Sequence, residues 1–334
     1  MCAWRWNEGS AWWRASVPRA GSVRSPAPTH RRWDAGLEPV LSVRPGDTIT
    51  VETDDFAGGQ ITRDSGLDDL ARLDFDQIYP LAGPIHVEGA EPGDVLAVEF
   101  LDVRTADWGW ACILPGLGLL PPGELDPLTI RFFDLTGGDW TEFAPGVRIP
   151  IEPFCGTVGV PQAGMHDVRI PPPHAGGGNI DLRHITRGTT LYLPVGAPGG
   201  LLSMGDAHAA QGDGEVAISG IECAATTTIR VTVERGMGLT APAIRRPAGS
   251  LTPRVDSGGW FATTGVEPDL MEATRAAVRA MIAQLGRERG LAPADAYMLC
   301  SLAGDLKITE IVDSPNWIVT CFMPNAVFDQ EGAV

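Results

Sequence analysis

The chain has 334 residues, with 42 acidic and 25 basic side chains and a formal net charge of −17. A balance this acidic disfavours binding to nucleic acid or to an anionic membrane, because phosphates would be repelled. Hydrophobic residues make up 44% of the chain, enough for a globular core. The 41 Gly and 28 Pro favour many short strands joined by turns over a helical fold.

The start of the chain has a different composition from the rest. Residues 1–32 hold six Arg, one acidic residue and four Trp. They contain no continuous apolar segment and so lack the pattern of a secretory signal. A transit peptide, or a start codon assigned too far upstream, would have the same composition. We expect residues 1–28 to form a disordered or irregular extension with no role in the chemistry.

Cysteine usage and hydropathy indicate the compartment. The six Cys lie far apart with no Cys-x-x-Cys pair, which favours reduced and mostly buried thiols. No apolar run reaches the roughly 18 residues needed to cross a bilayer. We therefore predict a cytoplasmic protein, with neither a membrane nor nucleic acid among its partners.

Residues 29–165 are predicted to form a β-rich, sandwich-like domain. Residues 40–53 (VLSVRPGDTITVET) alternate apolar and polar side chains around a Pro-Gly-Asp turn, the pattern of a β-hairpin. Residues 84–100 (PIHVEGAEPGDVLAVEF) repeat this pattern. Between them, residues 54–79 are expected to form a long acidic loop with a short helical piece near residues 67–73.

Residues 166–260 are predicted to combine β-strands with glycine-rich loops that supply the functional site. Here and in the preceding region, short strands are expected at residues 128–134, 156–160, 189–195, 216–223 and 226–234.

Residues 261–334 change to an α+β pattern. Apolar residues recur every three or four positions over residues 268–285, which predicts an amphipathic helix. A second helix is expected at 292–303 and a strand at 307–312. The predicted fold class is therefore mainly β, with a sandwich- or barrel-like architecture and an α+β C-terminal segment packed on the β core.

The strongest candidate site is the segment GDAHAAQGDGE at residues 205–215. Asp206 and His208 are two residues apart, so in an extended chain both side chains leave the same face. Gln211, Asp213 and Glu215 follow, separated by glycines that let the backbone turn tightly. Imidazole with carboxylate suits Zn²⁺, and Mn²⁺ or Fe²⁺ less well. The alternative is a polar turn whose side chains satisfy one another.

Several further polar residues are weaker candidates. Asn179 and Asp181 lie two apart in a second glycine-rich loop, for which a solvent-exposed loop is an equal explanation. His86 and Glu88 form another such pair, and Asp54, Asp55 and Gln60 lie in the acidic loop. Glu222 falls within a predicted strand, where a buried carboxylate would need a partner or a raised pKa. A Gly-x-Ser-x-Gly nucleophile motif is absent from the sequence.

The chain resembles the acetamidase/formamidase family at these same segments. The stretches that carry the resemblance are DDFAGGQI (54–61), GPIHVEGAEPGDVLAVEF (83–100), GGNIDLRHITRGTTLYLPV (177–195), GDAHAAQGDGEV (205–216) and YMLCSLAGDLKITEIVDSPN (297–316). The resemblance as a whole covers roughly residues 29–325. The resemblance implies a mostly β fold with an α+β C-terminal part. It also implies a hydrolase of small linear amides that releases ammonia and a short carboxylic acid, with a divalent metal, preferably zinc. The sequence departs from the family pattern at His86 and at residues 316–318, where different side chains would reshape the pocket.

A mechanism can be assigned to these residues as a hypothesis. Asp206 and His208 would bind the metal, with Asp54 as a further ligand; Zn²⁺ is preferred, and Ca²⁺ and Mn²⁺ stay open. Glu88 is the favoured general base, and Glu215 and Glu222 are its alternatives. The substrate-binding candidates are Asn179, Gln60 and Gln211, of which Asn179 and Gln60 would orient the amide.

Two other functions stay open. The chain could hydrolyse a larger amide or a related C–N substrate, or it could be a non-catalytic β-sandwich module that binds metal or sugar. His208 argues against a pure calcium site, which takes oxygen ligands. By analogy with the family, the partners would be a small neutral amide and further copies of the chain, with a dimer favoured.

The acidity is concentrated in one region. Residues 45–100 carry 13 acidic side chains against two Arg. An acidic cavity attracts a cation and disfavours an anionic substrate, which suits a metal and a neutral amide.

Overall fold

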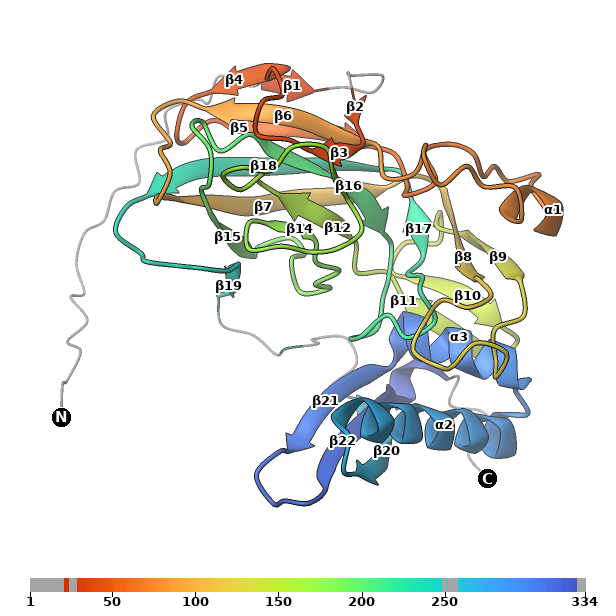
Figure 1. Ribbon diagram of the computed structural model, residues 1–334. Helices are drawn as coiled ribbons and strands as arrows, with labels where there is room; N and C mark the ends of the chain where they lie inside the picture. The colour runs from red at the N-terminus through yellow and green to blue at the C-terminus, as the bar shows by residue number, and fades with distance from the viewer. Residues whose placement is uncertain (1–20, 24–28, 248–250, 252–257, 329–334) are drawn as a thin grey trace.

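The computed structural model describes residues 21–23, 29–247, 251 and 258–328. Two β-sheets pack against each other, and a smaller unit of helices and strands lies at one end of them (Figure 1). Neither large sheet closes into a barrel within the described residues. The predicted fold class is confirmed as a β-sandwich with an α+β C-terminal segment. Most of the predicted extension, residues 1–20 and 24–28, lies outside the described residues.

One sheet has six strands. In spatial order they are β1 (Gly21–Val23), β5 (Thr48–Thr53), β18 (Ala225–Glu234), β7 (Val95–Thr105), β15 (Thr190–Pro194) and β19 (Ala243–Arg245). Buried side chains alternate along β5, where Ile49, Val51 and Thr53 face the core. This period of two is what a strand with one buried face requires. β1 pairs with β5, so part of the predicted extension forms regular structure.

The other sheet has nine strands. Six follow one another as β14 (Gly177–Asn179), β12 (Phe154–Gly159), β16 (Leu202–His208), β17 (Glu222–Cys223), β8 (Trp108–Ile113) and β9 (Thr129–Asp134). The remaining three are β6 (Leu81–Val87), which pairs with β16, and β2 (Thr29–His30) and β4 (Leu41–Val43), which pair with β6. Every residue of β12 and β16 is buried. The polar residues of β16 are therefore buried too, and they need partners inside the protein.

The two predicted hairpins are wrong in their pairing, although the strands exist. β4 joins the nine-stranded sheet, whereas β5 joins the six-stranded sheet, and β6 and β7 divide in the same way. Each Pro-Gly-Asp turn therefore carries the chain from one layer of the sandwich to the other. Alternation predicts that a strand has one buried face, but it does not identify the neighbouring strand.

Smaller elements surround the sandwich. They are α1 (Leu67–Leu70), the pair β3 (Arg32–Trp33) and β13 (Val168–Arg169), and the hairpin of β10 (Trp140–Ala144) and β11 (Val147–Pro150). α1 confirms the helical piece predicted in the acidic loop. The predicted strand at residues 216–223 is mostly loop, because only the two residues of β17 are extended there.

The C-terminal unit is a three-stranded sheet covered by helices. Its elements are β20 (Trp260–Glu267), α2 (Leu270–Arg289), α3 (Pro293–Ala303), β21 (Asp305–Glu310), β22 (Trp317–Pro324) and the 3₁₀ turn η2 (Asn325–Val327). The Asp269 side chain caps α2 by accepting the Glu272 backbone N–H at 3.0 Å, and Gly290 ends the helix in a left-handed conformation. Both predicted helices are confirmed. No helix of the described residues has the length and apolarity needed to span a bilayer.

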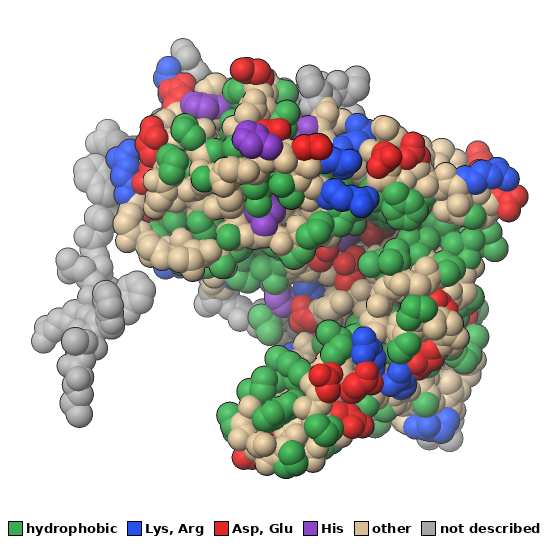
Figure 2. Space-filling view, viewed as in Figure 1, with side chains coloured by type: hydrophobic (Ala, Val, Ile, Leu, Met, Phe, Trp, Pro, Cys, Tyr) green, Lys and Arg blue, Asp and Glu red, His purple; other side chains and the backbone are tan. Residues whose placement is uncertain are grey.

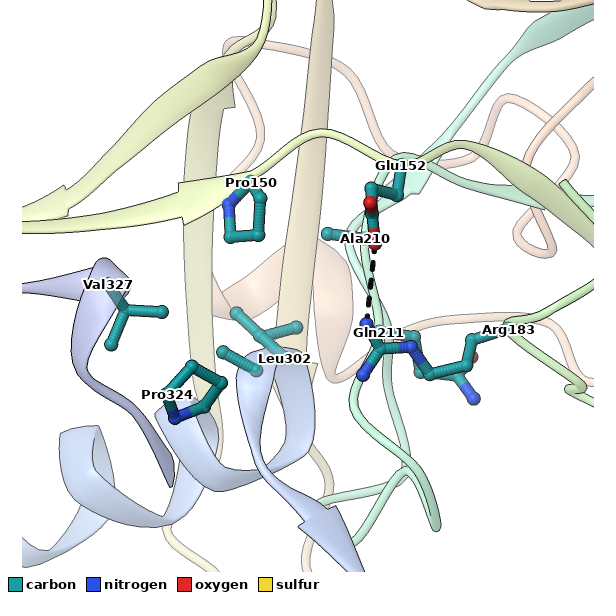
Figure 3. Close-up of a pocket in the computed structure, with 9 residues that line it drawn as sticks. Pro150, Glu152, Arg183, Ala210, Gln211, Leu302, Pro324 and Val327 are labelled. Carbon is teal, nitrogen blue, oxygen red and sulfur yellow. Dashed lines mark hydrogen bonds and ion pairs between the residues drawn. The ribbon is translucent and has the colours of Figure 1, made fainter. Parts of the chain in front are cut away.

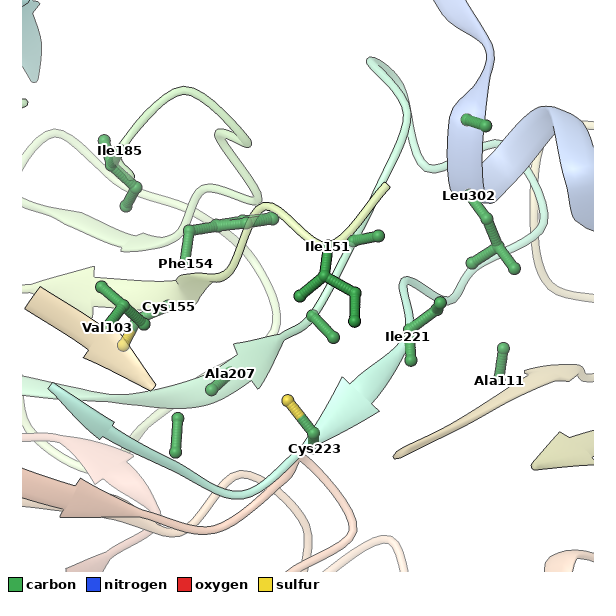
Figure 4. Close-up of a cluster of buried hydrophobic side chains, with 14 of the residues drawn as sticks. Val103, Ala111, Ile151, Phe154, Cys155, Ile185, Ala207, Ile221, Cys223 and Leu302 are labelled. Carbon is green, nitrogen blue, oxygen red and sulfur yellow. The ribbon is translucent and has the colours of Figure 1, made fainter. Parts of the chain in front are cut away.

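One continuous hydrophobic core joins the sandwich to the C-terminal unit. Figure 4 shows part of it, where Phe154 and Ala207 of the nine-stranded sheet lie in the same cluster as Leu302 of α3. Because the core is continuous, α3 is held in a fixed position against the end of the sandwich where β16 terminates.

Candidate functional site

A cavity of about 280 Å³ opens at the end of β16. Its acidic part is formed by Asp181, Asp206, His208, Glu215 and Glu222. Its apolar wall is formed by Phe56, Phe75, Ile78, Leu114, Leu117 and Ile218. Figure 2 shows the molecule hollowed between the sandwich and the C-terminal unit, with acidic side chains in the hollow and hydrophobic ones beside it.

The acidic part of the cavity contains two overlapping groups of possible metal ligands. Ligand atoms of Asp181, Asp206 and His208 all lie within 4.8 Å of one another, and so do those of His208, Glu215 and Glu222. His208 Nε2 lies 3.1 Å from Glu222 Oε2 and 3.4 Å from Asp206 Oδ1. Four carboxylates therefore converge on one imidazole.

Strand pairing sets this convergence. His208 and Glu222 lie directly opposite each other in the antiparallel pair of β16 and β17. On the other side of β16, Thr157 of β12 lies opposite Asn179 of β14. The Thr157 hydroxyl is 2.5 Å from Asn179 Oδ1 and 3.1 Å from Asp206 Oδ2. Four neighbouring strands, β14, β12, β16 and β17, thus bring their polar side chains to one point.

The loop that carries Glu215 is fixed by α3. The Ser301 hydroxyl donates to the Ser219 carbonyl at 2.8 Å and accepts from the Ala217 N–H at 3.1 Å. The Ser301 carbonyl accepts from the Gly212 N–H at 2.7 Å. These three bonds satisfy backbone groups on both sides of Glu215, so the C-terminal unit positions this side chain.

Backbone strain is concentrated around the cavity. Asp181, Asp206, Glu215, Tyr79 and Ile218 all line it, and all have positive φ angles between 42° and 77°. Asp tolerates this conformation, but Glu, Tyr and Ile do so at a cost of about 1–3 kcal/mol each. Such strain persists only where the surrounding structure imposes it, and it is commonest at functional sites.

Gly156 provides the space in which the carboxylates meet. A Cβ atom at this position would lie 2.9 Å from Asp206 Oδ2 and 2.7 Å from His208 Cε1, and it would also overlap Asp181. Any side chain here would push the ligand atoms apart. The cluster therefore depends on glycine at this position of β12.

Burial shifts the titration of the cluster. Burial raises the pKa of Asp181 well above its usual range, and the charges of Glu215 and Asp206 raise it further. Burial raises the pKa of Glu215 to about 7 and that of Glu222 to about 8, although His208 opposes both shifts. Burial disfavours the charged imidazole of His208, but Glu222 and Asp206 raise its pKa well above the usual value. Without a cation, the cluster therefore retains protons near neutral pH.

The cluster has the properties of a cation site. Among the described residues, Asp181 Oδ1 and His208 Nδ1 are buried without a hydrogen-bond partner, and Glu222 Oε2 faces His208 Nε2 at 3.1 Å. Within the part of the chain that the structure describes, no Lys or Arg forms an ion pair with any of its four carboxylates. Buried carboxylates are stable only when they are paired, protonated or bound to a metal. The donor set of oxygens and one imidazole nitrogen therefore fits a divalent cation.

Two of the predicted site residues lie away from the cavity. Glu88 follows the end of β6 on the surface, where its side chain is 54% exposed and lies 3.7 Å from Arg44. Glu88 is not among the residues that line the cavity, so the geometry does not support it as the general base. The Gln60 side chain donates to the Ala57 carbonyl and accepts from the Asp74 N–H, so it stabilises the acidic loop and contacts no part of the cavity.

Two more are placed next to the cavity. Asp54 lines a second cavity of about 170 Å³, which shares Glu222 with the first but does not bring Asp54 into the ligand groups. Gln211 lies beside Arg183 and Glu152 in a narrow pocket (Figure 3). Its Nε2 donates to the backbone carbonyl of Asp181 at 2.8 Å, so it orients Asp181 from behind.

The site also contains residues to which the sequence assigned no role. Asp181 was visible only as one half of a polar pair with Asn179, whose Nδ2 donates to Asp181 Oδ2 at 2.9 Å. Tyr79 lines the cavity, and burial together with the charge of Asp206 raises the pKa of its hydroxyl well above 10. No local pattern marks Tyr79, since it is the last residue but one before β6.

Known proteins match this chain over nearly its whole length. The model of the acetamidase/formamidase family matches residues 21–167 and 160–330. A formamidase of Methylophilus methylotrophus is 31% identical over 90% of this chain and 89% of its own. An acetamidase of Mycolicibacterium smegmatis is 29% identical over 80% and 82%.

Solved structures agree with these relatives. A gamma lactamase from Delftia acidovorans has a TM-score of 0.84 at 26% identity, covering 91% of this chain and 92% of that one. An acetamidase from Bacillus halodurans has a TM-score of 0.62 at 34% identity, covering 89% and 95%. The chain belongs to the acetamidase/formamidase family.

Proposed function

We propose that the protein is a metal-dependent hydrolase of small neutral amides, which it converts to ammonia and a carboxylic acid. The chain is an amidase acting on carbon–nitrogen bonds other than peptide bonds, as its relatives named formamidase and acetamidase support. The observation that carries the metal dependence is the convergence of four buried carboxylates on His208 in one cavity. The named relatives are enzymes, which argues against a non-catalytic binding module.

Asp181, Asp206 and His208 are the ligands we propose for a divalent metal, with zinc preferred. The imidazole favours zinc over calcium, which binds oxygen ligands. Mn²⁺ also accepts carboxylate with imidazole and stays an alternative. Bound there, the cation would polarise the amide carbonyl and lower the pKa of water towards about 7. Asp54, which the sequence favoured as a ligand, is not included.

Glu215 and Glu222 are the proton carriers we propose. Their raised pKa values, about 7 and about 8, suit groups that exchange protons at neutral pH. One carboxylate oxygen accepts a proton from the attacking water and donates it to the amide nitrogen as the C–N bond breaks. The other hydrogen of the water stays with the new carboxylic acid, so the products balance as acid and ammonia. Asn179 lines the cavity and can donate its second amide hydrogen to the substrate.

A cyclic amide is a second candidate substrate. It is favoured by the likeness to the gamma lactamase from Delftia acidovorans, whose TM-score of 0.84 exceeds the 0.62 of the Bacillus halodurans acetamidase. Hydrolysis of a cyclic amide uses the same groups but leaves the amine attached to the acid. A release assay for ammonia would therefore miss this reaction, whereas chromatography of the amino acid product would detect it.

A homo-oligomer, with a dimer favoured, and a cytoplasmic location are further proposals. The five cysteines that the structure describes are free and buried, which suits a reducing compartment.

Metal analysis combined with ammonia release tests the proposal. We expect Asp206→Asn and His208→Ala to lose most of the bound metal and of the activity. Asp213→Asn is the matched control, since Asp213 lies in the same glycine-rich segment but pairs with His184 at 3.5 Å, away from the ligand groups. Circular dichroism establishes that each variant is folded. Full metal content and full activity in both Asp206→Asn and His208→Ala would show that the site assignment is wrong.

A further inference from the structure

Three exposed apolar side chains surround the mouth of the cavity. Phe75 is 47% exposed, Leu117 is 42% exposed and Ile218 is 39% exposed. They come from three separate loops, after α1, after β8 and before β17. Figure 2 shows hydrophobic side chains next to the acidic hollow. Exposed apolar side chains that gather at a cavity mouth usually mark a surface for an apolar ligand.

Ile218 is held at this mouth in a strained conformation. Its φ angle is 77°, a value that is rare for a β-branched residue. Its N–H donates to the Glu215 carbonyl at 2.9 Å, and its neighbours Ala217 and Ser219 are bound to Ser301. This backbone strain costs about 1–3 kcal/mol. Because the Ile218 side chain is partly exposed, its burial offsets little of that cost. Glycine would avoid this cost, so the presence of a branched apolar side chain at this position points to a role at the cavity mouth.

The cavity is too large for the simplest amides. Its volume of about 280 Å³ is close to the lower end, about 300 Å³, of the range for pockets that enclose drug-sized ligands. Acetamide, with only a methyl group beside its amide, would fill only a small part of this space. With its amide group at the carboxylate cluster, it would leave most of the apolar wall wet, including Phe56 and Leu114.

We infer that the preferred substrates are amides with a branched aliphatic or aromatic acyl group, which Ile218, Phe75 and Leu117 bind at the mouth of the cavity. The inference rests on the proposed amide hydrolysis and specifies its substrate class. The polar amide group is directed to the carboxylates, and the apolar group covers the wall and the three mouth residues. Burial of this apolar surface supplies binding energy that formamide and acetamide lack.

The test compares ammonia release from formamide, acetamide, isobutyramide and benzamide by the full-length, zinc-loaded enzyme. We expect kcat/KM for isobutyramide or benzamide to exceed that for acetamide by about tenfold or more. We expect Ile218→Ala to lower this ratio by about fivefold, and Phe75→Ala to lower it in the same direction. Ile308→Ala is the matched control, because Ile308 is 57% exposed but lies on the C-terminal sheet outside the cavity. It should leave the ratio unchanged.

The possible failures are distinct. Highest kcat/KM for formamide or acetamide in the wild type would overturn the inference while leaving amide hydrolysis intact. Equal ratios in the wild type, Ile218→Ala and Phe75→Ala would overturn the role of the mouth residues. No ammonia from any of the four amides would instead contradict the proposed hydrolysis of linear amides, and the inference with it.

Discussion

His208 and Glu222 face each other across two antiparallel strands, with Nε2 of His208 and Oε2 of Glu222 3.1 Å apart. Both side chains are almost fully buried. His208 belongs to both groups of possible metal ligands, so the two groups meet at this pair. The proposed metal ligand and the proposed proton carrier are thereby held in contact by strand register.

Glu222→Gln should separate proton transfer from metal binding. The amide keeps the size of the side chain and its contact with the Ser219 hydroxyl, but it cannot accept a proton. We expect kcat to fall by about 10²–10⁴-fold, while zinc content stays close to that of the wild type. Single-turnover ammonia release and metal analysis measure the two quantities. Wild-type kcat would exclude Glu222 as a proton carrier, and loss of zinc would assign it to the metal ligands.

Gly156→Ala should disrupt the cluster without changing any of its side chains. The new methyl group would displace Asp181, Asp206 and His208, so we expect weaker zinc binding and reduced activity. Gly286→Ala is the matched control, because Gly286 lies within α2 with only one atom near its Cβ position, at 3.5 Å. The control should stabilise the helix by about 1 kcal/mol and retain zinc. Equal zinc affinity in both variants would contradict the role of Gly156.

The pairing of strands limits what sequence could predict about the fold. The strands β4 to β7, β9, β12, β15, β18 and β21, both C-terminal helices and the helical piece in the acidic loop follow from local periodicity and turn residues. The partners of β4, β5, β6 and β7 do not, because each Pro-Gly-Asp turn has the same local pattern whether it closes a hairpin or crosses between two sheets. The hydrophobic core between the two sheets decides which of these occurs, and residues from distant parts of the chain form that core.

The candidate site was predictable to the extent that its residues are close in sequence. Asp206 and His208 lie on one strand, and Glu222 stood out as a carboxylate within a predicted strand. Asp181 meets them only because β14, β12 and β16 are neighbours, which no local pattern shows. Glu88 belongs to a similar pair, His86 and Glu88, but it lies on the surface because β6 ends one residue before it.

The metal-free protein should lose stability as the pH rises. In the folded chain burial raises the pKa of Glu215 to about 7 and of Glu222 to about 8, from an ordinary value of 4.5. The folded state therefore favours the protonated carboxyl groups of Glu215 and Glu222. The stability that these protonated groups contribute is complete below about pH 4.5 and is lost as the pH rises through 7 and 8. Zinc replaces the protons, so the metal-loaded protein should resist this loss.

Thermal unfolding between pH 5 and pH 9, with and without zinc, tests this dependence. We expect the Tm of the metal-free wild type to fall more steeply with pH than that of metal-free Glu222→Gln, which lacks one titrating group. We also expect zinc affinity to increase with pH up to about 8, because binding releases protons. Identical Tm slopes for the two metal-free proteins would contradict a raised pKa at Glu222.

Ser301→Ala should show that the C-terminal unit positions the loop that carries Glu215, a proposed proton carrier. Loss of the hydroxyl leaves the buried Ser219 carbonyl and Ala217 N–H without this partner, at a cost of about 1–3 kcal/mol. Because Glu215 lies in the same loop, we expect kcat to fall while zinc, held by residues outside that loop, stays bound. Ser314→Ala is a control on an exposed turn of the same unit, with no effect expected on kcat or Tm. A lower Tm with unchanged kcat would mean that Ser301 stabilises the fold without positioning Glu215.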